Sequence, residues 1–363
     1  MPNDFYTTYL RLTPEDEEGG FPKPRFTVQE LMKHLVTGTE TITGDDLFVF
    51  SDLSRQDAAL VRQEWSFITP EQRQALVRAL VELATEDLDW QLGRFLRIAL
   101  EDPDDKVRRY AIDGLWEETE ADLLGPLIQV LYHDKSAEVR AAAAGVLGAY
   151  VLAGELDELD ASLAMRAEEA LLAILHNPAE PLAVQARALA SIAYSGETGV
   201  RQLIEDSYYS PDEELRISAL TAMGRSADTR WRGLARAELQ NPSPLMRAEA
   251  ARACGELEAK KAETDLLALL LDEEQVVRLA AIFALGRLGS AVARDALRTL
   301  TTSEDAIEAE AADTALEEML FFAGAEDITL LDDDGPDEGD DRDFAPWDTA
   351  EDFDDEALGK YDA

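Results

Sequence analysis

One pattern of residues recurs through the middle of the 363-residue chain, and it constrains the fold more than any other feature. Each copy opens with an apolar residue followed by a polar or basic one, and the last four apolar anchors lie 31 residues apart. A fixed period of this length is typical of a solenoid, in which each repeat contacts only its neighbours. The six anchor pairs are Val107-Arg108, Val139-Arg140, Val184-Gln185, Leu215-Arg216, Met246-Arg247 and Val277-Arg278.

The spacing of apolar residues within a copy predicts a helix. After Leu215 and after Val277, apolar residues follow at the fourth, fifth and eighth positions, which share one face of a helix with 3.6 residues per turn. A second amphipathic segment separates consecutive copies, so each period holds two helices. We therefore expect an all-α solenoid of helical hairpins that winds as a right-handed superhelix. A degenerate copy begins near Ile307, and the 14-residue excess between the second and third anchors is expected to lengthen a helix and insert a loop at 151–168.

A glycine stands nine residues after four of the anchors. Such a residue suits a helix C-terminus that needs a positive φ, and its missing side chain equally suits a close approach of two helices. The sequence leaves both interpretations open. The four positions are Gly148, Gly224, Gly255 and Gly286.

The motif D/P-x-x-x-V-R-x-x-A-x-x-A-L-G in these copies resembles HEAT repeats, particularly the short bacterial HEAT-like repeats of the phycobilisome-lyase type. The resemblance covers about residues 69–323. It implies a scaffold that binds other proteins, since solenoids of this kind serve as enzymes only in some cases. The alternative that it implies is a phycobilin-lyase-like enzyme or chaperone that handles a chromophore.

The regions outside the repeats have a different composition. Residues 1–68 predict an irregular cap with short helices, and residues 324–363 predict an acidic, disordered tail. From Glu326 to Ala363 the chain holds 17 acidic and 2 basic residues. Three tail aromatics, Phe344, Trp347 and Phe353, are spaced like a short docking motif, while the alternative is a tail that serves only solubility.

The charge of the whole chain restricts its partners. It carries 76 acidic against 33 basic residues, a formal net charge of −43. Such a surface repels phosphate backbones and anionic lipids, so we expect neither direct nucleic-acid binding nor membrane binding. DNA binding of the kind found in some HEAT-like base-repair glycosylases conflicts with this charge. We expect a protein partner, with a basic one favoured by charge, a cytoplasmic location, and a monomer as the favoured oligomeric state.

Residues that carry chemistry are few and scattered. Cys254 is the single cysteine, and His34, His133 and His176 lie far apart in the sequence. The sequence contains no phosphate-binding glycine loop, no dinucleotide-binding fingerprint and no G-x-S-x-G motif. We therefore expect no catalytic residues, no metal site and no cofactor.

Two series of repeated positions remain as candidates for distinct roles. The arginines after the anchors are uniform, and we interpret them as a structural ladder that bridges neighbouring repeats through carboxylates: Arg108, Arg140, Arg216, Arg247 and Arg278. The position ten residues after the anchor varies instead in charge and size, and aromatics beside arginine and glutamate are typical of binding hot spots. With Trp231 nearby, it gives our candidate partner-binding residues, for which a variable solvent-exposed rim is the alternative: Glu117, Tyr194, Arg225, Trp231, Glu256 and Arg287.

Overall fold

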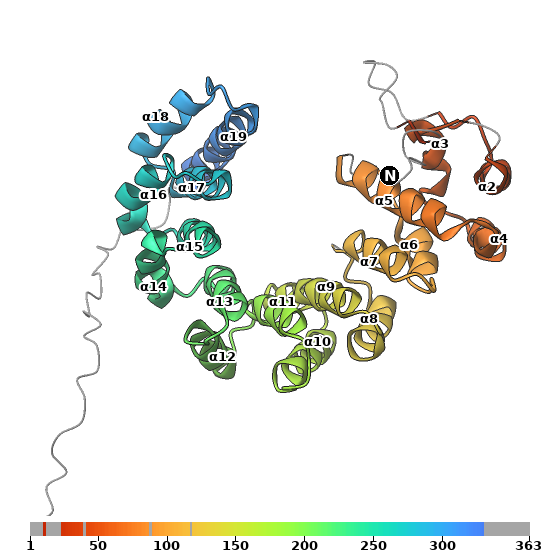
Figure 1. Ribbon diagram of the computed structural model, residues 1–363, viewed down its shortest axis with the longest axis horizontal. Helices are drawn as coiled ribbons and strands as arrows, with labels where there is room; N and C mark the ends of the chain where they lie inside the picture. The colour runs from red at the N-terminus through yellow and green to blue at the C-terminus, as the bar shows by residue number, and fades with distance from the viewer. Residues whose placement is uncertain (1–9, 12–22, 39–40, 87–88, 117, 330–363) are drawn as a thin grey trace, which may run out of the picture. The chain divides into compact units, whose positions relative to one another are not determined.

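The computed structural model describes residues 10–11, 23–38, 41–86, 89–116 and 118–329. By its internal contacts the chain divides into two units, Met1–Leu320 and Phe321–Ala363. The first unit is built almost entirely of helices that follow one another as hairpins in chain order (Figure 1). The all-α solenoid predicted from the 31-residue period is therefore the observed fold.

Each hairpin contributes its second helix to a continuous layer. These helices pack on one another in series, from α5 through α7, α9, α11, α13 and α15 to α17. The anchors lie in this layer, and Val107, Val139, Val184, Met246 and Val277 are at most 1% exposed. The second helices are α5 (Pro70–Glu86), α7 (Asp105–Asp113), α9 (Ala137–Glu155), α11 (Leu182–Ile192), α13 (Glu213–Arg225), α15 (Pro244–Glu256), α17 (Gln275–Leu288) and α19 (Ala306–Thr329).

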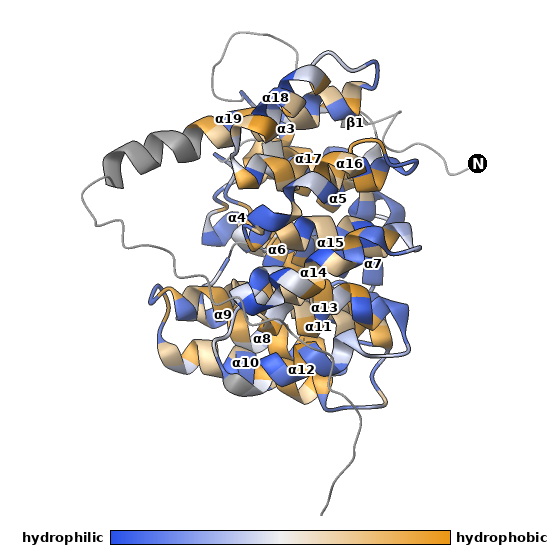
Figure 2. Cartoon of the chain, turned by 90° about the vertical axis from the view of Figure 1, so that its left-hand side faces the viewer, coloured by the Kyte–Doolittle hydropathy of each residue, from blue (hydrophilic) through white to orange (hydrophobic). Residues whose placement is uncertain are grey.

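The first helices of the hairpins cover one side of that layer and pack against the second helix of their own hairpin or, for α10 and α18, mainly against that of the preceding one. Figure 2 shows hydrophobic and hydrophilic residues alternating along the helices, as amphipathic packing requires. The first helices are α6 (Gly93–Ala99), α8 (Ala121–His133), α10 (Ala161–Leu175), α12 (Thr198–Tyr208), α14 (Arg232–Ala237) with η3 (Thr229–Trp231) and η4 (Glu238–Gln240), α16 (Glu263–Leu269) with η5 (Lys260–Ala262), and α18 (Ala291–Leu300).

Gly224, Gly255 and Gly286 lie in the last turn of their helices, Gly148 lies seven residues before the end of α9, and all four allow close helix packing. A Cβ atom on Gly255 would lie 2.7 Å from the Cα of Ala284, and one on Gly286 would lie 2.9 Å from the Cβ of Ala315. Among the described residues, the glycines with positive φ are Gly38 and Gly289, so the four do not end helices in the left-handed conformation. Of the two interpretations left open by the sequence, the structure selects close packing.

Three residues after Gly224, Gly255 and Gly286 the backbone adopts the left-handed conformation and the helix ends. Ala227 has a φ of 51°, Glu258 of 50° and Gly289 of 67°, and these positions are again 31 residues apart. They reverse the chain between a second helix and the next first helix. Two of the three stops therefore use residues for which this conformation is strained.

The long helix α9 carries part of the 14-residue excess. It has 19 residues, against 13 in each of α13 and α15. By length and composition α9 could cross a membrane, yet half of it is buried inside the protein, where it packs against α7, α8, α10 and α11. Its apolar character therefore serves the core. The Tyr150 hydroxyl, near the end of α9, donates a 2.9 Å hydrogen bond to the Glu120 carbonyl oxygen and joins the helix to the loop before α8.

The N-terminal cap is organised around one buried carboxylate. The Asp46 side chain is 0% exposed and accepts hydrogen bonds from the backbone N–H of Arg25 at 3.1 Å and of Thr43 at 3.0 Å. The Arg25 guanidinium and these hydrogen bonds outweigh burial and lower the pKa of Asp46 to about 2. The cap contains β1 (Leu10–Arg11) paired in parallel with β2 (Ile42–Thr43), together with α2 (Val28–Thr37), α3 (Gly44–Leu47), η1 (Phe48–Phe50), α4 (Arg55–Glu64) and η2 (Trp65–Phe67).

Candidate interaction surface

Four of the predicted partner-binding residues form one row along the ends of the second helices. Tyr194 lies just after α11, Arg225 and Glu256 are the last residues of α13 and α15, and Arg287 lies in the last turn of α17. All four are half-buried. We call Tyr194, Arg225, Glu256 and Arg287 the helix-end row.

The first two members of the row are in direct contact. The guanidinium carbon of Arg225 lies 5.5 Å from the centre of the Tyr194 ring, which is a cation–π distance. The Arg225 Nη1 also donates a 2.9 Å hydrogen bond to the Ala190 carbonyl oxygen of α11. The arginine is therefore held across two repeats.

Glu256 continues the row between two arginines. Its carboxylate lies against the position where a Cβ of Gly224 would be, so the glycine of α13 makes room for the side chain from α15. Burial raises the pKa of Glu256, while the charges of Arg225 and Arg287 oppose this effect only in part. The row thus alternates an aromatic ring, a cation, an anion and a cation in consecutive repeats.

Two of the predicted partner-binding residues are not in this row. Glu117 lies outside the described residues. Trp231 was expected past a helix end, where its removal would cost little stability, and this expectation is wrong. It ends η3 with 5% of its surface exposed and belongs to the hydrophobic core, because burying the large indole between repeats stabilises their stacking. The tail residues Phe344, Trp347 and Phe353 also lie outside the described residues.

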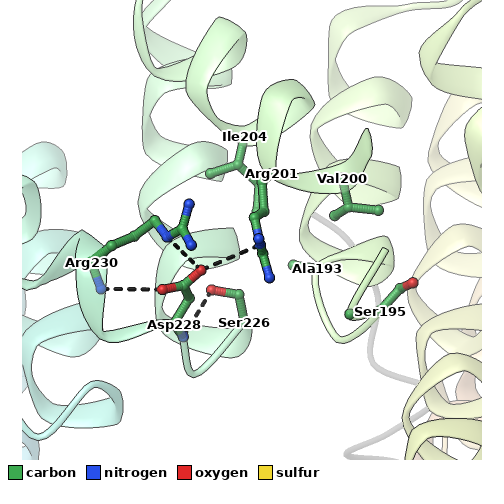
Figure 3. Close-up of a pocket in the computed structure, with 9 residues that line it drawn as sticks. Ala193, Ser195, Val200, Arg201, Ile204, Ser226, Asp228 and Arg230 are labelled. Atoms are coloured by element: carbon green, nitrogen blue, oxygen red, sulfur yellow. Dashed lines mark hydrogen bonds and ion pairs between the residues drawn. The ribbon is translucent and has the colours of Figure 1, made fainter. Parts of the chain in front are cut away.

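A pocket of about 280 Å³ opens beside the first two members of the row (Figure 3). Its apolar wall consists of Ala193 from the end of α11 and of Val200 and Ile204 from α12. Ala193 precedes Tyr194 in the chain, and Ser226, another lining residue, follows Arg225. The pocket and the row therefore share one edge of the solenoid.

The polar side of the pocket holds two cations and one anion. The Nε atom of Arg230 lies 2.8 Å from Oδ2 of Asp228, and the Nε atom of Arg201 lies 3.5 Å from the same oxygen. The other carboxylate oxygen of Asp228 accepts the backbone N–H of Arg230 at 3.2 Å. Figure 3 shows the guanidinium groups of Arg201, from α12, and of Arg230, from η3, directed to this carboxylate.

The sequence did not identify this pocket, because Asp228, the acidic residue that joins its two arginines, does not recur. The positions that follow Asp228 by one and two periods hold Ala259 and Ser290. An acidic residue that breaks the repeat pattern beside a helix end is the signal that could have revealed it.

The uniform arginines lie at the starts of the second helices, where they join consecutive repeats. Arg108 pairs with Asp134 and Arg247 with Asp272, each through two hydrogen bonds of 2.7–2.9 Å. Arg140 pairs with Glu180 at 2.7 Å and Arg278 with Glu308 at 2.5 Å. Each acidic partner belongs to the following repeat.

The same arginines also close the loop before their own helix. The Nη1 atom of Arg216 donates to the carbonyl oxygens of Ser210 and Pro211, both at 2.9 Å, and Arg108, Arg140, Arg247 and Arg278 donate to the carbonyl six residues back in the same way. For Arg216, the neutral Asn241 stands where Asp134 and Asp272 stand for the others. This arginine therefore closes its loop without the carboxylate that the pattern would provide.

A further member of the ladder was missed by the sequence analysis. The Arg73 Nε lies 2.7 Å from Oδ2 of Asp102, whose side chain is 0% exposed, and the Trp65 indole N–H donates to the same oxygen at 2.6 Å. Gln72 stands in the place of the apolar anchor before Arg73, and the step to Arg108 is 35 residues, which obscured the pattern.

The single cysteine is placed for packing. Cys254 lies in α15 with 0% of its surface exposed. Burial raises the pKa of its thiol to about 12, so the thiol stays protonated at neutral pH and is a poor nucleophile.

Comparison with solved structures finds distant likenesses. A human deoxyhypusine hydroxylase in complex with glycerol is 16% identical, with a TM-score of 0.34, over 81% of this chain and 97% of that one. The CpcE–CpcF complex of a Nostoc phycocyanin lyase is 18% identical, with a TM-score of 0.45, over 66% and 94%. An engineered protein is 20% identical, with a TM-score of 0.35, over 81% and 88%. At these scores none of them carries an argument about function.

No curated protein matches the chain. The family model for HEAT repeats matches residues 93–169 and 234–317, which cover hairpins at both ends of the series. These matches fall on the stacked hairpins and on four of the ladder arginines. The chain therefore contains HEAT repeats over these two ranges.

Proposed function

We propose that this protein is a non-catalytic interaction scaffold or assembly factor, and that its protein partner docks across the helix-end row. The observation that carries the proposal is the unlike chemistry of Tyr194, Arg225, Glu256 and Arg287 at one repeated position. Packing alone favours one residue type at equivalent positions of a solenoid, as the ladder arginines illustrate. Variation at a half-buried position is what a surface adapted to one partner requires.

The contacts within the row support this role. Tyrosine and arginine are enriched among the residues that dominate binding energy. Arg225 is already fixed by the Tyr194 ring and the Ala190 carbonyl. A side chain held in this way loses little conformational entropy when a partner covers it, which favours affinity.

The charge of the chain supports a basic partner. The net charge of −43 attracts cationic surfaces over the Debye length and speeds their association at low salt. In this proposal the acidic tail, through Phe344, Trp347 and Phe353, provides a second docking element, and the protein acts in the cytoplasm.

The test begins with affinity capture from native lysate to identify the partner, followed by calorimetry with the purified pair. Arg225→Ala is compared with Arg298→Ala, which removes an exposed arginine of α18 whose Nη1 lies 3.7 Å from Oδ1 of Asp295. Weaker binding of the first variant alone supports docking on the row. Equal affinity of both variants and the unmodified chain would contradict it.

A further inference from the structure

We propose that the pocket beside the helix-end row binds the C-terminal carboxylate of a partner polypeptide whose last residue is apolar. The inference rests on the proposed function for the existence of the partner. The chemistry of the pocket itself is argued from its own residues.

The pocket carries an excess of positive charge. Among the side chains that line the pocket, the two guanidinium groups of Arg201 and Arg230 share one carboxylate, that of Asp228. Their side chains are 44% and 54% exposed, against 20% for Asp228. The cations are therefore more accessible than the anion that holds them, in a chain whose net charge is strongly negative.

A helix end adds to this potential. Val200 and Arg201 lie in the first turns of α12, an 11-residue helix whose N-terminus adjoins the pocket. The positive end of a helix dipole favours an anion near its first turn. The N–H of Gly196 already donates to Glu155 at 3.2 Å, so the arginines are the principal donors to a ligand.

The apolar wall selects the kind of anion. Ala193, Val200 and Ile204, each at most 3% exposed, line the buried side of the cavity, and the two arginines lie on its exposed side. A ligand that satisfies both sides needs a carboxylate and a short apolar group on adjacent atoms, as in a C-terminal valine or alanine. The volume of about 280 Å³ lies just below the range of roughly 300–1,000 Å³ that holds drug-sized ligands, which suits one residue better than an extended segment.

The overall charge favours a carboxylate over a phosphate. A phosphate monoester carries about −1.5 to −2 charges at neutral pH, against −1 for a carboxylate, so the acidic surface opposes it more strongly. A single carboxylate can pair with both arginines, and the acidic residues of the rest of the chain repel it less than they repel a phosphate. Planar guanidinium groups also match the geometry of a carboxylate, which can accept two parallel hydrogen bonds.

The test uses the full chain with labelled isoleucine and valine methyl groups, titrated with N-acetyl-valine and observed by NMR. We expect saturable shifts of the Val200 and Ile204 methyl signals. N-acetyl-valinamide, which has the same shape without the charge, should bind at least about tenfold more weakly, as should N-acetyl-valine to Arg201→Gln or Arg230→Gln. Arg298→Gln is the matched control and should bind like the unmodified chain.

Several results would overturn the inference. They are no saturable shift with N-acetyl-valine, equal binding of the acid and the amide, unchanged binding by both arginine variants, or tighter binding of inorganic phosphate. This experiment does not require the partner. If N-acetyl-valine binds in the pocket while Arg225→Ala leaves partner affinity unchanged, the pocket stands and the proposed docking across the row fails.

Discussion

The two ends of the second helices contrast in sequence, although both follow the same 31-residue period. At their starts an arginine recurs in most repeats, with Gln185 in its place in α11; the arginine closes its own loop and usually pairs with a carboxylate of the next repeat. At their ends the residue changes with every repeat, from Tyr194 to Arg225, Glu256 and Arg287. Uniformity indicates a position set by the geometry of stacking. Variation indicates a position where stacking tolerates several side chains, so that another requirement, such as binding a partner, determines which side chain is present.

The largest expected effect tests the structural end. Asp102→Ala removes the partner of both Arg73 and Trp65 and leaves a buried guanidinium unpaired, so it should lower the free energy of unfolding by about 3–5 kcal/mol. Glu101→Ala, one residue earlier, removes an exposed partner that lies 3.8 Å from Arg62 and should change stability by less than about 0.5 kcal/mol. Denaturant unfolding measures both. Similar losses for the two variants would show that the buried pair does not hold the first repeats together.

The next effect tests the variable end. Arg225→Ala should weaken partner binding by about 2 kcal/mol if the arginine is a hot spot. It should cost only about 1–2 kcal/mol of stability, for the cation–π contact with Tyr194 and the hydrogen bond to the Ala190 carbonyl together. Trp231→Ala should show the reverse, a loss of about 3–5 kcal/mol in stability, because the indole is buried in the core. Calorimetry of binding and denaturant melts separate the two; lost stability with unchanged affinity for Arg225→Ala would assign the row to the scaffold.

Ionisation of the carboxylates at the two ends of the second helices should change the free energy of unfolding with opposite signs. Hydrogen bonds from Arg247 lower the pKa of Asp272, so its ionised form stabilises the fold above the unfolded value of about 3.9, and this contribution is lost as the pH falls through the lower folded value. Burial raises the pKa of Glu256, so its ionised form destabilises the fold at neutral pH. That cost disappears as the pH falls below the unfolded value of about 4.3.

Two substitutions isolate these contributions. At pH 7, Asp272→Asn should lower the free energy of unfolding by about 1 kcal/mol, while Glu256→Gln should raise it by less than about 1 kcal/mol. Both differences should shrink in acid, at pH values below both pKa values of the residue concerned. Unfolding curves from pH 2 to 7 measure them. A loss of stability at pH 7 for Glu256→Gln would mean that its arginine contacts outweigh burial.

The sequence predicted what is periodic and missed what is local. The anchors and the hairpins follow from apolar spacing, since a helix buries one face whichever repeat it belongs to. The burial of Trp231 could not be predicted in this way, because it depends on how a short first helix packs on its neighbours. Arg73 escaped notice because its repeat lacks an apolar anchor. The pocket depends on residues after α11, in α12 and after α13, and on one acidic residue, Asp228, that the period does not repeat.

The smallest expected effect concerns the turns just beyond the helix-end row. Ala227 and Glu258 adopt positive φ, which costs an L-residue roughly 1–2 kcal/mol, whereas Gly289 adopts it at the equivalent position without that strain. Ala227→Gly and Glu258→Gly should each stabilise the chain by about 0.5–1 kcal/mol, after the greater freedom of glycine in the unfolded state is subtracted. Gly289→Ala, where a Cβ meets no atom within 4 Å, should destabilise it by a similar amount through backbone strain alone. Denaturant melts of the three variants measure this. If the two glycine variants lose stability instead, then contacts of the Ala227 and Glu258 side chains offset the backbone strain. The residue types in these turns, like those in the helix-end row, would then depend on more than the geometry of stacking.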